Sequence, residues 1–427
     1  MLTVDRFRLL IFILILCPFS VWAEQTVLSL DLALEEARNN NPNLAKMQAR
    51  SQAMAAMPTQ AGALPDPTLH FNAMNIPNDT YDLDQEPMTQ LQVGISQAFL
   101  FPGKRLLKKN ISELQSRAAN TQVDETRLQL EKYIKITWWQ LFFLDRALEI
   151  IDRNRTLLKQ FINIARTKYE VGEGLQQDVL LAQLELSKLL DKQIQLQAKR
   201  EEQSIRLNQL LGRAPETNTV LPITVYMILP AIADQKTLLL KADSNRPLLQ
   251  VYRQQLDASS QQLELSKKGY YPDFNLGAFY GNRQGENAMG DEWSDFVSLK
   301  LALKLPLYYS SKQGKAIDQS TAEQLSQQYA LLDANNKVVA QISQARIDFQ
   351  KSREQFELFQ HGIIPQAQQT VASMLAGYQV NKVDFLNLVR SQITLFNYET
   401  RYWMALSNAN QSLAKLVAAV GEETIYE

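Results

Sequence analysis

The sequence has few of the residues that build disulfides, metal sites and loops. Its 427 residues include one cysteine, two histidines, 15 glycines and 15 prolines. Cys17 lies in the first 23 residues, so no thiol remains elsewhere for a disulfide or for thiolate chemistry. His70 and His361 lie more than 200 residues apart, and we expect neither to bind a metal. We therefore predict no metal site and no cofactor.

The sequence also lacks an excess of positive or negative charge. The formal net charge is -1 and 21% of residues are charged, which gives no electrostatic basis for binding nucleic acid. The mean hydropathy of -0.25 argues against a polytopic helical membrane protein. The motifs H-E-x-x-H and G-x-S-x-G and a phosphate-binding loop do not occur, so we expect that the protein is not an enzyme.

The longest apolar run lies at the N-terminus. Residues 9–16 are apolar, follow Arg6 and Arg8, and precede Ala23, a small residue typical of a cleavage site. The run is shorter than the about 20 residues that span a bilayer. We therefore expect residues 1–23 to be a removed signal peptide, with a retained anchor as the alternative.

Cys17 leaves a second alternative open, because a cysteine in such a segment can accept a lipid. Leu16 precedes it, where a lipoprotein signal has a small residue. Cleavage without lipidation is favoured for this reason.

Two stretches of the chain follow one pattern. The segment YEVGEGLQQDVLLAQLEL from Tyr169 aligns without a gap with YQVNKVDFLNLVRSQITL from Tyr378, at an offset of 209 residues (378 − 169). The same offset places Gly212 over Gly421. Such self-similarity predicts a tandem duplication. The expected parts are a first repeat 24–212, a linker 213–235, a second repeat 236–421 and a C-terminal tail 422–427.

Each repeat has the same expected order of elements. Apolar residues spaced near 3.6 positions, with few breakers, predict helices, and strict alternation predicts strands. A helix over 104–170 would be about 100 Å long, and an extended coiled coil is the alternative that explains the helices alone. The expected helices are 29–63, 104–170, 175–211, 236–269, 311–376 and 384–420, and the expected strands are 67–76, 89–100, 273–282 and 294–306.

The strands have one apolar and one polar face. Val297, Leu299 and Leu301 point one way, while Ser298 and Lys300 point the other. This alternation is typical of a transmembrane β-barrel, although a soluble sandwich with one wet face shows it too. Aromatic residues near the strand ends favour the barrel, since they form interfacial girdles. They are Phe99, Phe101, Tyr270, Tyr271, Trp293, Tyr308 and Tyr309.

Four strands cannot close a barrel by themselves, because lipid leaves no edge strand unpaired and single-chain barrels need about eight strands. Two chains would supply eight strands and three would supply twelve, and a solute-wide lumen favours three. The predicted fold class is mainly α with a small transmembrane β-barrel contribution. Duplicated long-helix hairpins and four strands per chain would form a trimeric α/β barrel, a channel-tunnel.

These features together resemble the outer-membrane efflux family of TolC-like channels. The likeness lies in the duplicated plan, the Y-x-V-G turn at Tyr169–Gly172, its partner at Tyr378, and the repeat ends at Gly212 and Gly421. It implies a homotrimer set in outer membrane lipid, with helices that extend into the periplasm. It also implies two protein partners, a periplasmic adaptor (membrane fusion) protein and an inner-membrane RND-type pump.

Two stretches, LPDPTLHF and SQAFLFPGKR, look most like the branch that serves heavy-metal cation pumps. The expected function is therefore export of substrate, heavy-metal cations, across the outer membrane in a tripartite efflux system. A channel for drug or detergent efflux or for type I protein secretion is an alternative. A periplasmic coiled-coil adaptor or structural protein is an alternative of another class.

In the family that the sequence resembles, the turns between the second and third helices of each repeat are periplasmic tips. The tips would span 169–178 and 378–387 here. The channel narrows and the adaptor docks at these tips. The turn residues expected at the docking surface are Gly172, Glu173, Gly174, Asn381, Lys382 and Val383.

The resemblance also implies a gate, in which Asp178 bonds to Tyr378. The arginine that would complete this latch falls at Val383, so that link is absent unless Lys382 replaces it. A helix-terminal charge that favours the macrodipole explains Asp178 equally well.

A pair of aspartates that forms an acidic ring in the family falls on Asn387 and Arg390. We therefore expect Asp384 and Asp178 to supply the acidic charge, with Arg390 making the ring less negative. A ring of three carboxylates favours cations in a narrow pore. For Arg390, an ion pair with a neighbouring helix is the favoured interpretation.

The strands are expected to run directly into long helices at a barrel–tunnel seam. Pro102 and Pro306 would end the ladders because proline has no N–H to donate. Gly103 would let the backbone turn, and Lys104 would lie just below the bilayer. The second repeat is expected to use a longer corner, from Pro306 to Lys315, with Gly314 and Lys315 in the matching places.

Overall fold

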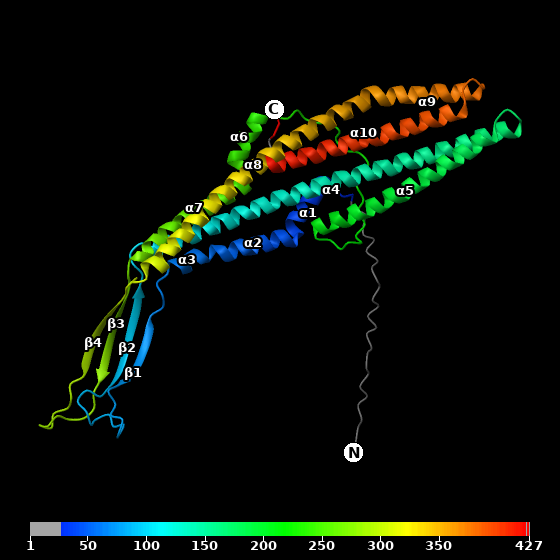
Figure 1. Cartoon of the computed structure of the whole chain (residues 1–427). Helices are drawn as coiled ribbons and strands as arrows, with labels where there is room; N and C mark the ends of the chain where they lie inside the picture. Colours follow the sequence, from blue (N-terminus) through cyan, green and yellow to red (C-terminus); the bar gives the residue numbers. More distant parts are fainter. Residues whose placement is uncertain (1–26, 424, 427) are drawn as a thin grey trace, which may run out of the picture.

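The molecule is a long helical bundle with a four-stranded sheet at one end and two helical hairpin turns at the other (Figure 1). The computed structural model describes residues 27–423 and 425–426, so the expected signal peptide and Cys17 lie outside the described residues. The helices are α1 (Leu30–Asn40), α2 (Pro42–Ala55), α3 (Met57–Gly62), α4 (Lys104–Glu170), α5 (Gln176–Leu211), α6 (Gln235–Asn245), α7 (Pro247–Lys267), α8 (Gly314–Leu358), α9 (Ile364–Gln379) and α10 (Phe385–Val420). The strands are β1 (Thr68–Met74), β2 (Gln90–Phe99), β3 (Asp273–Asn282) and β4 (Phe296–Lys304).

The longest helix, α4, begins and ends where the sequence predicts, at Lys104 and Glu170. It contains neither proline nor glycine, and its residues keep an unbroken apolar stripe, so nothing interrupts the hydrogen-bond ladder. At 1.5 Å per residue it spans about 100 Å. Among the described residues, no helix is both long enough and apolar enough to cross a membrane.

The expected helices 29–63 and 236–269 are each divided, which corrects the prediction. The first breaks at Asn41 and the second at Arg246, both in extended conformation and both followed by proline. Proline pushes the preceding residue out of the helical region. At Asn41 the side chain also caps α2, where its Oδ1 accepts from the Leu44 N–H at 3.0 Å.

The expected helix 311–376 is also interrupted. A π-helical turn, η3 (Phe359–Ile363), joins α8 to α9, and a second one, η2 (Tyr309–Gln313), precedes α8. Pro365 follows η3 within the first turn of α9. Because proline has no N–H to donate to the preceding turn, a regular α-helix cannot run through this position without a local change.

The sheet is antiparallel, in the order β1-β2-β3-β4. Its strands agree with the expected ranges to within two residues at every end. The register is continuous, since Ile95 pairs with Leu69 on one side and Ala278 on the other, and Ala278 pairs with Leu299. β1 and β4 are the two edges of this sheet and have no partner strand within the described chain.

The hydrophobic core lies along the bundle as separate clusters. Around the middle, Trp138 and Phe142 of α4 stack with their ring centroids 5.8 Å apart and join α1, α2, α5 and α10. A second cluster joins α6, α7, α8 and α10. A third, with Phe161, Tyr378 and Phe385, holds the two hairpins together near their turns. Among the described residues, the strands contribute no core cluster of comparable size.

Candidate functional site

One face of the sheet is apolar and open. Val297, Leu299 and Leu301 of β4 have 77%, 86% and 62% of their surface exposed, and Phe71 of β1 has 75%. The pairing places Leu69, Ile95, Ala278 and Leu299 in one row across all four strands. Apolar surface of this extent is what lipid covers on a membrane barrel.

The opposite face is polar and borders a cavity of about 700 Å³. Its walls include His70, Asn72, Gln92, Ser298 and Lys300. His70 is held by its Nε2, which lies 2.8 Å from Ser96 Oγ. Within the described part of the chain, no group of three or more His, Cys, Asp or Glu side chains is placed to hold a metal ion.

Lys104, the first residue of α4, makes the hydrogen bonds that connect the sheet to the helices. Its side chain is buried, and Nζ donates to the Tyr271 carbonyl at 2.8 Å and to Asp273 Oδ1 at 2.8 Å. Asp273 also accepts from the Phe101 N–H at 2.8 Å. Lys104 therefore connects the start of α4 to the start of β3, a contact between distant residues that the sequence did not reveal.

The two junctions are not alike. Gly103 has φ +89°, a left-handed conformation that glycine adopts without strain, and it lies directly between Pro102 and the first residue of α4. Gly314 has φ -59° and is ordinary helix, and Lys315 pairs with its own neighbour Asp318 at 2.8 Å. The longer corner expected between Pro306 and Lys315 is present and contains the π-turn η2. Gly314 and Lys315 nevertheless do not repeat the conformation of Gly103 or the pairing of Lys104 across the junction. Pro306 lies two residues after the end of β4.

At the other end of the molecule, both hairpin turns close in the same way. Gly172 and Asn381 are in the left-handed region, with φ +77° and +59°, which glycine and asparagine tolerate. The N–H groups of Glu173 and Gly174 donate to the Lys168 carbonyl at 2.8 and 3.0 Å, and the Lys382 N–H donates to the Gly377 carbonyl at 2.9 Å.

Lys168 links the two turns. From the last turn of α4, its Nζ donates to the Tyr378 carbonyl at 2.9 Å and to the Asn381 side chain, and it lies 4.8 Å from the centre of the Tyr378 ring. Among the contacts that the structure describes, the cation beside Tyr378 is therefore Lys168, from the first hairpin, and not Lys382 of the second turn. Sequence reasoning missed Lys168; a cation in the last turn of a helix signals only a favourable macrodipole.

Tyr378 and Asp178 lie near each other without the expected bond. Tyr378 is 5% exposed, and its hydroxyl has no hydrogen-bond partner among the described residues. Burial raises the pKa of Tyr378, and the negative charge of Asp178 raises it further. The hydrogen bond implied by the resemblance is therefore absent from this single chain.

Asp178 lies in the first turn of α5 and is half-buried. Burial raises its pKa, a hydrogen bond to the backbone of Leu175 acts in the opposite direction, and the charge of Asp384 adds to the increase. The structure thus brings Asp178, Tyr378 and Asp384 into one group. Two carboxylates held close together repel when both are ionised.

Asn387 and Arg390 lie on the exposed face of α10, and the Asn387 N–H donates to the Asp384 carbonyl at 3.1 Å. The opposite face of α10 packs in the third core cluster through its buried residues Phe385, Leu388 and Val389. Arg390 forms no ion pair within the residues that the structure describes, so the ion pair expected for it is not found in a single chain.

Three comparisons with known proteins agree with this geometry. The profile of a family described as "Outer membrane efflux protein" matches residues 33–213 and 238–422. The cobalt-zinc-cadmium resistance protein CzcC of Cupriavidus metallidurans is 21% identical over 409 residues, which cover 92% of this chain and 90% of that protein.

Solved structures of similar shape are the outer membrane protein VceC of Vibrio cholerae and the transmembrane channel protein CusC. VceC has a TM-score of 0.77 at 19% identity, covering 92% of this chain and 96% of its own. CusC has a TM-score of 0.77 at 15% identity, covering 92% of each chain. At these identities the likeness establishes the fold, and the family profile spans most of both halves of the chain. The chain belongs to the outer membrane efflux protein family.

Proposed function

We propose that this outer-membrane efflux channel is the exit duct of a tripartite system that exports heavy-metal cations. The observation that supports the substrate class most directly is the likeness to CzcC, a cobalt-zinc-cadmium resistance protein, along 92% of the chain. The channel would receive cations from an inner-membrane RND-type pump through a periplasmic adaptor. Metal is cargo here, and selection among metals belongs to the pump.

The experiment is survival of a strain that lacks the gene, on graded cobalt, zinc, cadmium and copper and on detergents and dyes. We expect sensitivity to at least one of the metals, restored by a plasmid copy of the gene. Sensitivity confined to detergents and dyes would overturn the metal assignment and favour drug efflux. A secretion defect without either sensitivity would favour type I protein secretion.

We propose that the channel is a homotrimer of tandem repeats, 24–212 and 236–421. Each chain supplies four strands whose outer edges, β1 and β4, have no partner in the described chain. Three copies would close a twelve-stranded barrel and leave no open edge in lipid. Apolar residues exposed along α5 and α8 are available for contacts between copies; they include Leu180, Leu184, Ile194, Tyr329 and Leu332.

The trimer is tested on gels of the protein purified in mild detergent. An unheated sample should migrate as a species about three times heavier than the boiled chain, as stable barrels resist detergent. Migration as a monomer in both samples, together with a monomer mass by light scattering, would contradict the proposal.

We propose that the hairpin turns dock the adaptor and that the group around Asp178 and Tyr378 controls the periplasmic opening. Lys168 supports this role, because it joins the two hairpins of one chain with charge-assisted hydrogen bonds. Asp384 adds negative charge next to Asp178. Asn387 and Arg390, exposed on α10, would line the constriction and make it less negative than an aspartate ring.

The gate is tested by single-channel recording in planar bilayers. Asp178→Ala should raise conductance or change cation selectivity, because it removes a carboxylate from each chain near the narrowest point. Glu173→Ala, which removes an exposed carboxylate from the turn itself, is the matched control. Equal conductance and selectivity in Asp178→Ala and the unsubstituted channel would leave Asp178 as a helix-terminal charge.

A further inference from the structure

In the half of the bundle that adjoins the sheet, four helices lie in one row (Figure 1). α2 packs against α4, α4 packs against α7, and α7 packs against α8. The row repeats the order of the strands, because α2 and α3 lead into β1 and β4 leads into α8. The two ends of the helical row are therefore α2 and α8, the helices that adjoin the two edge strands.

The first end of the row runs along the part of α4 nearest the sheet. At the start of α2, Asn43 borders the same hollow as Gln122 of α4. At the end of α3, Gly62 lies against the side chain of Lys109. α2 and α3 together therefore pass residues 109–122 of α4.

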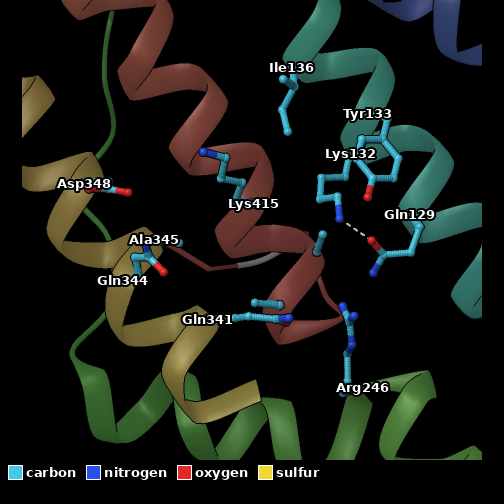
Figure 2. A pocket seen from close by; sticks show the side chains of 12 residues that line it. Gln129, Lys132, Tyr133, Ile136, Arg246, Gln341, Gln344, Ala345, Asp348 and Lys415 are labelled. Atoms are coloured by element: carbon cyan, nitrogen blue, oxygen red, sulfur yellow. Dashed lines mark hydrogen bonds between the residues drawn. The ribbon is translucent and has the colours of Figure 1, made fainter. Parts of the chain in front are cut away.

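Two contacts place α7 and α8 along the same stretch of α4. Arg246, the residue before α7, donates from Nη2 to Oε1 of Glu125 at 2.8 Å, and Figure 2 shows Arg246 and Gln129 of α4 on the same side of a hollow that both border. Further along α7, Ser260 Oγ accepts from Gln324 Nε2 of α8 at 2.8 Å. Ser260 lies 14 residues after Arg246 (260 − 246), which is about 21 Å closer to the sheet. The part of α8 that follows Gln324 is therefore at the same distance from the sheet as α2.

This part of α8 is apolar on two opposite sides. On one side, the buried residues Ala334 and Val338 pack with α6 and α7. On the other side, Leu325, Tyr329 and Leu332 have 49%, 62% and 54% of their surface exposed. Tyr329 lies nine residues before Val338 (338 − 329), which is two and a half turns and so half a rotation away. A helix that is apolar all round is normally covered all round, so this exposed row lacks a partner in the single chain.

α2 has a surface of complementary shape on its outer side. Leu44 is buried in the first core cluster, toward α4. Ala45, Ala49 and Ala53 are exposed, and their spacing of four residues keeps them in one row. Large side chains of one helix pack well over small side chains of a facing helix. The alanine row therefore has room for a side chain of the size of Tyr329.

The charges beside the two rows are also complementary. Lys46 and Arg50 are exposed on α2, which has no acidic residue, and neither forms an ion pair within the part of the chain that the structure describes. On the facing stretch of α8, Asp333 and Lys337 pair with each other at 2.6 Å. Glu323 is exposed there and has no cationic partner among the described residues. The cations of α2 and this carboxylate would attract each other across an interface.

We propose that in the assembled channel α2 of one copy covers the exposed row of α8 of the next copy, with Tyr329 seated against the alanine row. This pairing rests on the homotrimer proposed above and names the helices that meet in it. α2 runs toward the sheet and α8 runs away from it, so the two helices are antiparallel. A closed ring of three requires a contact of this kind, which joins two different surfaces of the same chain. The pairing continues the closure of β4 against β1 from the sheet into the tunnel.

The test joins the two helices through introduced thiols, in the full-length channel in outer membranes. Residues 24–427 contain no cysteine, so no native thiol of that part competes. One variant combines Ala49→Cys with Tyr329→Cys, and a second combines Ala53→Cys with Leu325→Cys. Mild oxidation of each should give covalent dimers and trimers on non-reducing denaturing gels, because a disulfide forms only where two Cα atoms come within about 7 Å. A reductant should return both variants to single chains.

Ala49→Cys combined with Glu354→Cys is the matched control. Glu354 is also exposed on α8 but lies 25 residues beyond Tyr329 (354 − 329), about 37 Å along the helix. This control and each single substitution should stay single chains. A dimer formed by Tyr329→Cys alone would overturn the proposal, since it would show α8 facing α8 of another copy. A covalent adduct of Tyr329→Cys with a different protein would overturn it as well.

Failure of this pairing can be distinguished from failure of the trimer. Light scattering in mild detergent gives the mass of the assembly without any thiol. If the mass is that of a trimer and neither cysteine pair gives covalent dimers or trimers, the contact between α2 and α8 is wrong and the homotrimer stands. If the mass is that of a monomer, the homotrimer and the contact are both wrong.

Discussion

At the scale of single residues, Lys168 shows how a helix end becomes a link between hairpins. It is half-buried, and its ammonium group contacts a carbonyl, an amide oxygen and an aromatic face of the second turn. These groups lie about 210 residues further along the chain. Nothing local in the sequence marks the pairing, since it exists only after both hairpins lie side by side.

Replacing Lys168 by methionine should loosen the turns without unfolding the bundle. The change removes charge-assisted hydrogen bonds worth about 1.5–3 kcal/mol and keeps most of the apolar side chain. Amide hydrogen exchange of residues 376–384 should become faster by about tenfold or more. Lys382→Met, which replaces an exposed lysine in the same turn, should leave that exchange unchanged; equal effects of both changes would contradict the link.

The raised pKa of Asp178 has a consequence for pH. A carboxyl that holds its proton more tightly when folded stabilises the folded tip below its unfolded pKa, near 3.8, and loses this contribution as pH rises through the raised value. Asp178→Asn removes the repulsion from Asp384. At neutral pH the variant should therefore slow the exchange of tip amides.

This difference between Asp178→Asn and the unsubstituted protein should shrink toward zero as pH falls below about 4, where Asp178 is protonated in both states. Hydrogen exchange across a pH series, corrected for the intrinsic rate, measures it. A difference that stays constant with pH would exclude Asp178 as its source.

At the scale of elements, the sequence predicts helices well where no breaker occurs and poorly where prolines interrupt the pattern. Helix α4 has no proline and agrees with the expected range at both ends. The expected helix 29–63 contains Pro42 and Pro58, and the structure divides it at both places. Apolar periodicity continues across such breaks, which is why it did not reveal them.

Among the candidate site residues, those that belong to a local repeated pattern were predicted and those defined by long-range contacts were not. The turns were found, because Gly172 and its counterpart Asn381 belong to a pattern that repeats along the chain. The contacts of Lys104 and Arg246 were not found, since their partners Asp273 and Glu125 lie 169 and 121 residues away. Ion pairs between distant residues leave no periodic signal.

The junction between α4 and the sheet should depend on Lys104. Lys104→Met removes the ion pair with Asp273 and the bond to the Tyr271 carbonyl. Of the two hydrogen bonds that the Asp273 carboxylate accepts, from Lys104 and from the Phe101 N–H, only the second would remain. Because Lys104 is buried, we expect a loss of about 1–3 kcal/mol in the free energy of unfolding.

The measurement is the thermal midpoint followed by circular dichroism in one detergent. Arg105→Met is the matched control, because Arg105 is the next residue and is exposed. A midpoint lowered to the same extent by both substitutions would show that charge near the lipid boundary matters, rather than the bond to Asp273.

At the scale of the whole molecule, the sheet and the helical bundle differ in the polarity of their surfaces. The sheet presents apolar side chains to the outside, whereas the bundle presents a mixed surface with many exposed Gln, Asn and Ser side chains. The sheet has little core of its own. Its environment, lipid on one face and water on the other, therefore decides whether it is stable.

Leu299→Lys tests which face meets lipid. A lysine at mid-depth on the lipid side of a barrel costs about 2–4 kcal/mol, so the amount of protein recovered in the outer membrane fraction should fall severalfold. Ser298→Lys places the same group on the polar face, which already includes Lys300, and should be tolerated. Equal recovery of both variants would contradict the assignment of the two faces.

The unpaired edges β1 and β4 also constrain how the protein reaches its place. A lone copy in hydrocarbon would expose two rows of backbone N–H and C=O groups, each costing several kcal/mol. In the homotrimer proposed above, entry into the bilayer and association of the copies would therefore be one event. Its rate should rise more steeply than linearly with the density of chains, so low synthesis would slow maturation disproportionately and lengthen exposure to periplasmic proteases.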